Sequence, residues 1–219
     1  MTSAPRRIGR ARNLVAALAC ALLAGCSSSA TSSSTTKPTT TTTTTLSAQQ
    51  VALRPKLLIL ADFPSGWIED KEADAASTAG TPNCLGDVVR ARGSTARVNA
   101  VFVGPKAGAD ASIQTVAAFA AGQVQGSVSS IKAGFLACDG TTFTQDEQTA
   151  DIATRLLDNL PTGDAGFAAE MELSIGTQHV FLDVFFGVKG DDATVLVWRS
   201  PTASPALFAE TAAKALDRL

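Results

Sequence analysis

Histidine, the side chain that most often moves protons in enzymes, occurs once in the 219 residues, at position 179. A Ser-His-Asp or Cys-His catalytic site needs such a base. His179 falls in a predicted hairpin turn between two apolar runs, and a histidine there is more often a solvated surface residue. A zinc site would need ligands that the sequence does not have. We therefore predict no catalytic residue and no metal site.

Carboxylates are more numerous, with adjacent pairs at Asp146-Glu147 and Asp191-Asp192. None of them fits the calcium-binding loop pattern. Spacing alone leaves open a glycosidase pair, but sugar clefts usually use exposed Trp or Tyr, and the chain has two Trp and no Tyr. No glycine-rich phosphate loop occurs, so we expect no cofactor. These patterns favour binding over catalysis.

The N-terminus carries the strongest chemical motif. Arg6 to Arg12 form a positive segment, and the apolar run from Leu14 to Leu23 has the length of a signal-peptide core. The following Leu23-Ala24-Gly25-Cys26 matches the bacterial lipobox. We predict a signal peptide over residues 1–25, after which Cys26 becomes the first mature residue and carries a diacylglycerol group. The alternative is an ordinary secretory signal in which Cys26 is incidental.

Lipidation would decide where the protein is located. Two acyl chains hold a protein on a membrane, whereas one binds only marginally. Residues 26–46 follow as a tether made almost entirely of Ser and Thr, which offers no apolar surface to bury. We expect a protein anchored to the extracytoplasmic face of the cell membrane. After residue 25 the chain has 14 Lys and Arg against 20 Asp and Glu, and this acidic balance disfavours nucleic acid as a partner.

Two cysteines remain beyond the signal and the anchor. Cys84 and Cys138 make one even pair in an exported chain, where disulfides form and persist. A redox or metal pair is less well supported, because no C-x-x-C motif is present. We predict a Cys84–Cys138 disulfide.

These residues must be positioned by one globular domain, residues 47–219, of class α+β: an antiparallel β-sheet meander packed against helices, an α/β sandwich. Apolar periodicity predicts the elements. We expect strands at 96–103, 149–157, 167–175, 180–188 and 193–199, and helices at 46–60, 84–92, 110–135 and 204–219.

Four aromatic side chains are candidates for a ligand cleft. Phe63 and Trp67 flank a turn that contains Pro64 and Gly66, and they give it two large apolar anchors. In the 180–188 strand, Phe181 and Phe185 add a second apolar face. That face either packs in a core covered on both sides or lines an apolar pocket. We carry both interpretations forward.

A resemblance adds to these patterns. The lipobox with its Ser/Thr tether, the turn from Leu60 to Trp67, and the segments 116–119 and 135–138 resemble actinobacterial sensor-domain lipoproteins. These are similar to the extracellular sensor domains of mycobacterial serine/threonine kinases and to Mog1/PsbP-like lipoproteins. The resemblance implies an antiparallel sheet with helices around a cleft, and a role in binding.

The sequence thus predicts a non-catalytic, lipid-anchored binding or sensor protein of the cell envelope, with an apolar or envelope-derived ligand. Two alternatives stay open. One is a scaffold that contacts other envelope proteins, and the other is a carboxylate-based hydrolase of cell-wall material.

Overall fold

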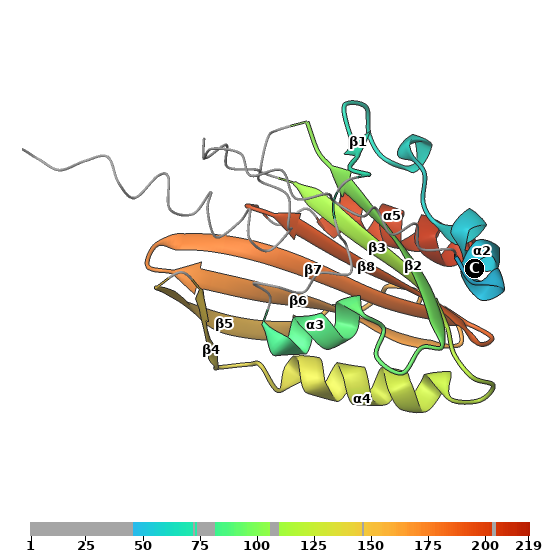
Figure 1. Ribbon diagram of the computed structural model, residues 1–219. Coiled ribbons are helices and arrows are strands. Elements are labelled where there is room, and N and C mark those ends of the chain that lie inside the picture. Colours follow the sequence, from blue (N-terminus) through green and yellow to red (C-terminus); the bar gives the residue numbers. More distant parts are fainter. Residues whose placement is uncertain (1–45, 72, 74–81, 106–109, 146, 203–204) are drawn as a thin grey trace, which may run out of the picture.

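The computed structural model describes residues 46–71, 73, 82–105, 110–145, 147–202 and 205–219 (Figure 1). The predicted signal peptide, Cys26 and nearly all of the tether lie outside these residues. Among the helices of the described part, none has the length and apolar content needed to cross a bilayer.

Within these residues, eight antiparallel strands form one sheet in the order β1-β2-β3-β8-β7-β6-β5-β4. Neighbours in the sheet are consecutive in the chain except at the centre, where β3 pairs with β8. The strands are β1 (Ile68–Glu69), β2 (Ala96–Val103), β3 (Ala111–Ala118), β4 (Thr142–Gln145), β5 (Gln148–Leu156), β6 (Ala165–Ile175), β7 (Gln178–Lys189) and β8 (Asp192–Ser200).

Helices cover both faces of this sheet. Figure 1 shows α3 and α4 on one face and α5 on the other, with α2 beside the edge formed by β2. The helices are α2 (Ala48–Leu53), α3 (Asn83–Val89), α4 (Val124–Leu136) and α5 (Pro205–Asp217), with short 3-10 turns η1 (Arg54–Lys56) and η2 (Leu60–Asp62). The predicted α+β class, with an antiparallel sheet packed against helices in one domain, is confirmed.

Side chains alternate between the two faces along each central strand. In β7, Leu182, Val184 and Phe186 pack into the core under α3 and α4, whereas Phe185 packs into a second core under α5. A sheet buried on both faces needs apolar residues at successive positions, and β7 and β8 provide them.

Most predicted elements match observed ones. The strand at 96–103 is β2 with the same bounds, and those at 149–157, 167–175, 180–188 and 193–199 are β5 to β8 within a few residues. The helices at 84–92 and 204–219 are α3 and α5.

The helix predicted over 110–135, with Gly122 and Gly126 as the point where it could break and resume, is wrong in its first half. Residues 111–118 form β3, and only 124–136 form a helix, α4. Because β3 lies in the middle of the sheet, seven of its eight residues are buried. A strand buried on both faces loses its two-residue alternation, and here Ile113, Val116 and Ala117 happen to fall at helical spacing.

The helix predicted over 46–60 is also too long. It begins as expected, since Ser47 and Gln50 form a reciprocal capping box. The α-helix ends at Leu53, and Pro55 lies in the 3-10 turn that follows. Proline has no N–H to donate and crowds the preceding turn, so the helix cannot continue through it.

The predicted disulfide is confirmed. Cys84 at the start of α3 and Cys138 just after α4 are bonded, with their Cα atoms 6.3 Å apart. The bond joins the two helices that cover one face of the sheet.

Candidate binding site at the sheet edge

The four aromatic residues predicted to rim a cleft do not lie together at a surface. Phe63, Trp67 and Phe185 are 7%, 8% and 0% exposed and belong to the core under α5. Phe181 is only partly buried and is not a member of that core. The two pockets described below are lined by none of the four. The burial of Phe63, Trp67 and Phe185 agrees with the core interpretation.

The sequence places these rings in the core for local reasons. At Gly66, φ is +90°, as a type II turn requires at its third residue, and this turn brings Trp67 back over the sheet. The Phe63 ring then lies 5.0 Å from that of Trp67 and 4.3 Å from that of Phe102. Aromatic pairs at these distances add stability beyond their burial.

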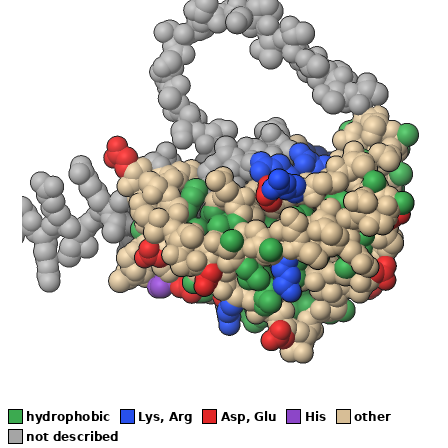
Figure 2. Space-filling model, turned by 90° about the horizontal axis from the view of Figure 1, so that it is seen from below, with side chains coloured by type: hydrophobic (Ala, Val, Ile, Leu, Met, Phe, Trp, Pro, Cys, Tyr) green, Lys and Arg blue, Asp and Glu red, His purple; other side chains and the backbone are tan. Residues whose placement is uncertain are grey.

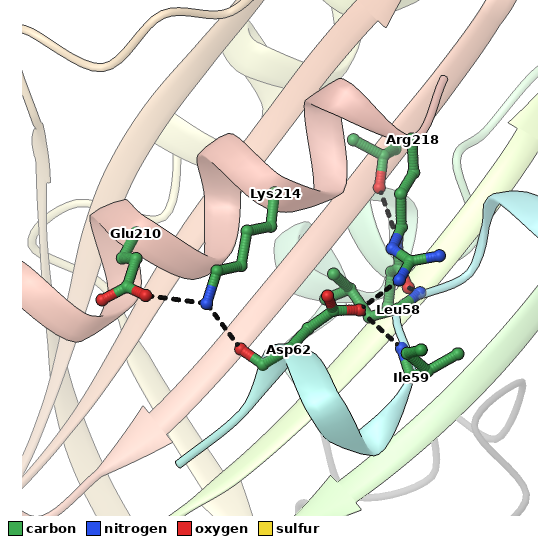
Figure 3. A network of polar contacts seen from close by, with 8 residues as sticks. Leu58, Ile59, Asp62, Glu210, Lys214 and Arg218 are labelled. Carbon is green, nitrogen blue, oxygen red and sulfur yellow. Dashed lines mark hydrogen bonds and ion pairs between the residues drawn. The ribbon is translucent and has the colours of Figure 1, made fainter.

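A polar network holds this turn against α5 (Figure 3). The Asp62 carboxylate accepts a hydrogen bond from the Ile59 N–H at 2.8 Å and pairs with Arg218 at 2.8 Å. Lys214 donates to the Asp62 carbonyl at 3.0 Å and pairs with Glu210 at 2.7 Å. The C-terminal helix therefore fixes η2, and with it the start of β1.

One pocket lies where β1 ends at the edge of the sheet. Its volume is about 420 Å³, and it is lined mainly by polar groups. Glu69, Asp70 and Lys71 come from the end of β1 and the residues after it, Asn99 and Val101 from β2, and Arg54 from η1. The Asp70 N–H donates to the Val101 carbonyl at 2.9 Å, which closes one end of the pocket. This pocket is the candidate binding site.

A second pocket of about 240 Å³ lies beside the disulfide. Pro82, Asn83, Cys138 and Phe143 are among the residues that line it. We assign it no role.

Carboxylates come together elsewhere, on the α5 face of the sheet. Arg155, Glu170, Asp183, Trp198 and Ser112 are successive cross-strand partners on β5, β6, β7, β8 and β3. Residues directly opposite one another in antiparallel strands point to the same face, so they form one row.

Within this row, Arg155 donates to Glu170 at 2.8 Å. Glu170 and Asp183 are 6% and 4% exposed. The Trp198 indole N–H and the Ser112 hydroxyl have no hydrogen-bond partner in the described part of the chain. The row is thus a buried polar line through an otherwise apolar layer. Its carboxylates are side-by-side neighbours and do not face each other across a cleft.

The pKa of Asp183 is raised from 3.8 to about 6. Burial is the main cause, the charge of Glu170 acts in the same direction, and Arg155 opposes both. The native state therefore holds this proton more tightly than the unfolded chain does. The free energy of unfolding should rise as pH falls from 7 through about 6 and level off below about 4, by at most about 3 kcal/mol. We expect Asp183→Asn to remove most of this rise.

Urea unfolding at several pH values would measure the effect. Asp151→Asn is the matched control, because Asp151 is an exposed carboxylate on β5, and it should keep the native pH dependence. An Asp183→Asn protein with the same pH dependence as the native one would contradict the assignment.

His179 lies at the start of β7, directly opposite Ser174 of β6. Its Nδ1 is 2.6 Å from a Glu172 carboxylate oxygen and 3.1 Å from the Ser174 hydroxyl. Figure 2 shows the histidine, in purple, at the surface with acidic side chains nearby. A catalytic triad needs the hydroxyl on one ring nitrogen and the carboxylate on the other. Here both contact Nδ1, so this is not triad geometry.

Comparison with known proteins gives one informative result. No family model and no curated protein matches the chain. Among solved structures, it is similar to the extracellular domain of PknH from Mycobacterium tuberculosis. The TM-score is 0.57 with 13% identity, over 77% of this chain and 95% of that one. The likeness is one of fold.

The residues of the edge pocket were not among the sequence candidates. Asn99 and Val101 lie in a correctly predicted strand, but nothing in the sequence marks that strand as an edge. The sequence feature that could have indicated the pocket is the charged stretch from Glu69 to Lys71, which follows the aromatic turn.

Proposed function

We propose that this protein is a lipid-anchored binding or sensor protein on the extracytoplasmic face of a bacterial cell membrane, and that it binds an envelope-derived ligand in the pocket at the β1–β2 edge. The fold shared with the extracellular domain of a mycobacterial protein is the observation that carries the proposal. The lipobox at residues 23–26 and the Ser/Thr tether agree with an exported, anchored chain.

The lining of the pocket determines the kind of ligand that we propose. The large aromatic side chains are used in the core, and the pocket carries cationic, anionic and amide groups. A ligand with polar and charged groups fits it better than the apolar ligand expected from the sequence. Desolvating such a lining with an apolar ligand would leave its polar groups unpaired, at a cost of about 1–3 kcal/mol for each.

The two alternatives have less support. For the hydrolase, Glu170 and Asp183 are cross-strand neighbours in the sheet, but both are buried and neither lines a pocket described above. For the scaffold, Val51, Ile59, Leu60 and Ile68 are exposed apolar side chains near the start of the body. Nothing in the structure places a partner on them.

The anchoring part of the proposal predicts a large change in location. Cys26→Ser removes the thiol that would be lipidated, so the protein should leave the membrane fraction or accumulate as an unprocessed precursor. Fractionation with and without detergent, followed by intact mass measurement, would show this. Cys20→Ser is the matched control, because Cys20 lies inside the predicted signal peptide. Membrane association of Cys26→Ser that still requires detergent for release would refute the anchor.

A further inference from the structure

The large apolar side chains that stay exposed are concentrated in one part of the chain. Among the described residues they are between 41% and 61% exposed, and they are Val51, Ile59, Leu60, Ile68 and Leu156. All but Leu156 lie within residues 46–71, which we call the N-terminal strip. In Figure 1 the strip, in blue and blue-green, runs from α2 to β1 along the β2 side of the sheet, whereas β5 lies near the opposite edge. The exposed apolar groups therefore lie mainly on one side of the molecule.

The chain on either side of Ile59 and Leu60 is fixed to the core. Leu58 is 3% exposed, and its N–H donates to the Gln114 side chain of β3 at 2.6 Å. Phe63 is buried in the core under α5. Because both flanking segments are held in this way, Ile59 and Leu60 cannot turn inward and stay presented to the surroundings.

The strip is also the electrically neutral part of the domain. It carries three Lys or Arg and three Asp or Glu, whereas residues 72–219 carry 10 Lys or Arg against 17 Asp or Glu. Moving net charge toward hydrocarbon is costly, because the charged groups lose their hydration. Contact with a bilayer is therefore easier for the strip than for the acidic remainder of the domain.

We infer that the N-terminal strip rests on the surface of the lipid bilayer, with its four exposed apolar side chains inserted at the boundary between headgroups and acyl chains. The inference rests on the proposed function, because the anchor at Cys26 supplies the membrane. Cys26 and Leu46 are 20 positions apart, a separation that any conformation of the chain spans in at most about 70 Å. Since the strip begins at Leu46, the side of the domain that the anchor keeps near the membrane is the side with the exposed apolar groups.

A bilayer fits the strip better than a protein partner does. Charged residues alternate with the apolar ones along it, among them Arg54, Glu69 and Lys71, whereas the core of a protein interface is depleted of charged residues. At a membrane surface the apolar side chains enter the hydrocarbon boundary while the charged groups stay hydrated among the headgroups. The same three charged residues line the edge pocket, so the pocket would open beside the headgroups.

The test places a nitroxide spin label on the strip. The mature protein with Ile59→Cys is labelled and reconstituted into vesicles of phosphatidylethanolamine and phosphatidylglycerol. A label in the bilayer is more accessible to oxygen, which concentrates in hydrocarbon, and less accessible to a water-soluble nickel chelate. The ratio of these two accessibilities should be several-fold higher for Ile59→Cys than for Leu156→Cys. The latter is the matched control, because Leu156 is also exposed but lies on β5.

A second pair of variants tests whether the apolar side chains cause the insertion. In protein labelled at Val51→Cys, the double change Ile59→Gln with Leu60→Gln should lower the accessibility ratio several-fold, because two of the inserted groups are lost. Leu156→Gln in the same background should leave the ratio unchanged.

Equal accessibility ratios at positions 59 and 156, whether both labels are in water or both in lipid, would overturn the inference. A label at position 59 that is shielded in native membranes but not in vesicles of pure lipid would also overturn it, because that result indicates a protein partner.

The lipid anchor is measured separately by intact mass. One label per chain shows that Cys26 is blocked, and two show that its thiol is free and that the anchor has failed. In the second case Cys26→Ser removes the extra label, and added vesicles then test the strip alone. A lipidated protein whose label at position 59 stays in water would leave the anchor standing and refute the docking.

Discussion

Truncation of Phe185 to alanine should destabilise the domain by about 3–5 kcal/mol, the usual cost of removing a fully buried aromatic ring. The ring lies over Gly187 of the same strand. If Gly187 carried a Cβ atom, that atom would lie 2.6 Å from the Phe185 ring and 3.0 Å from the Leu216 side chain of α5. The Phe185 ring is thus enclosed between the β7 backbone at Gly187 and helix α5. Since domains of this size are stable by only about 5–15 kcal/mol, the loss should be plain in urea unfolding.

Phe181→Ala is the matched control for this substitution. Phe181 lies on the same face of β7, two strand repeats away, but it is only partly buried. Its truncation should cost markedly less. Equal, small losses of unfolding free energy for both variants would favour the cleft interpretation. Tryptophan fluorescence is a second test, because ready quenching of Trp67 and Trp198 by a soluble quencher would also favour the cleft. Both indoles are buried, so we expect blue-shifted, protected emission.

Removal of the disulfide should have an effect of similar size. Cys84 and Cys138 are 54 positions apart, and closing a loop of that length restricts the unfolded chain by about 4 kcal/mol. Reduction, or the double change Cys84→Ser with Cys138→Ser, should lower the thermal midpoint by roughly 10 °C. Calorimetry with and without reductant would measure it.

The double variant provides its own control for this experiment, because its midpoint should no longer respond to reductant. An unchanged midpoint on reduction of the native protein, with complete reduction verified by mass, would show that the loop is already restricted in the unfolded state. The rest of the fold would then have to supply the stability assigned to this bond.

The elements that could be predicted from the sequence are those whose residues favour one structure. Helix α5 keeps its buried residues on one side, and β7 and β8 are long apolar runs rich in Val and Phe, which favour a strand even where both faces are buried. Strand β3 could not be predicted, because Ser112, Gln114 and Thr115 interrupt its apolar residues and the rest fall at helical spacing. The two-residue β1 is too short to carry any period.

The candidate site was less accessible to prediction than the fold. The edge pocket lies beside β1, and the Asp62 network that holds the chain before β1 involves Lys214 and Arg218, far away in the sequence. The buried polar row depends on the register of five strands, and no pattern within one strand specifies its register with the next. Of the four aromatic candidates for a ligand cleft, Phe63, Trp67 and Phe185 lie in the core under α5.

The pairing of β3 with β8 has a consequence for how the chain reaches its native state. Gln114 on β3 donates to Thr194 on β8, and these partners are 80 positions apart. The strands from β4 to β8 are joined by successive hairpins, so they can associate locally, whereas closing the long loop between β3 and β8 is entropically costly. A chain that emerges N-terminus first, from a ribosome or through a translocon, exposes β3 long before its partner arrives. Strand β3, whose residues are nearly all buried in the native sheet, must therefore stay clear of other chains until β8 has emerged.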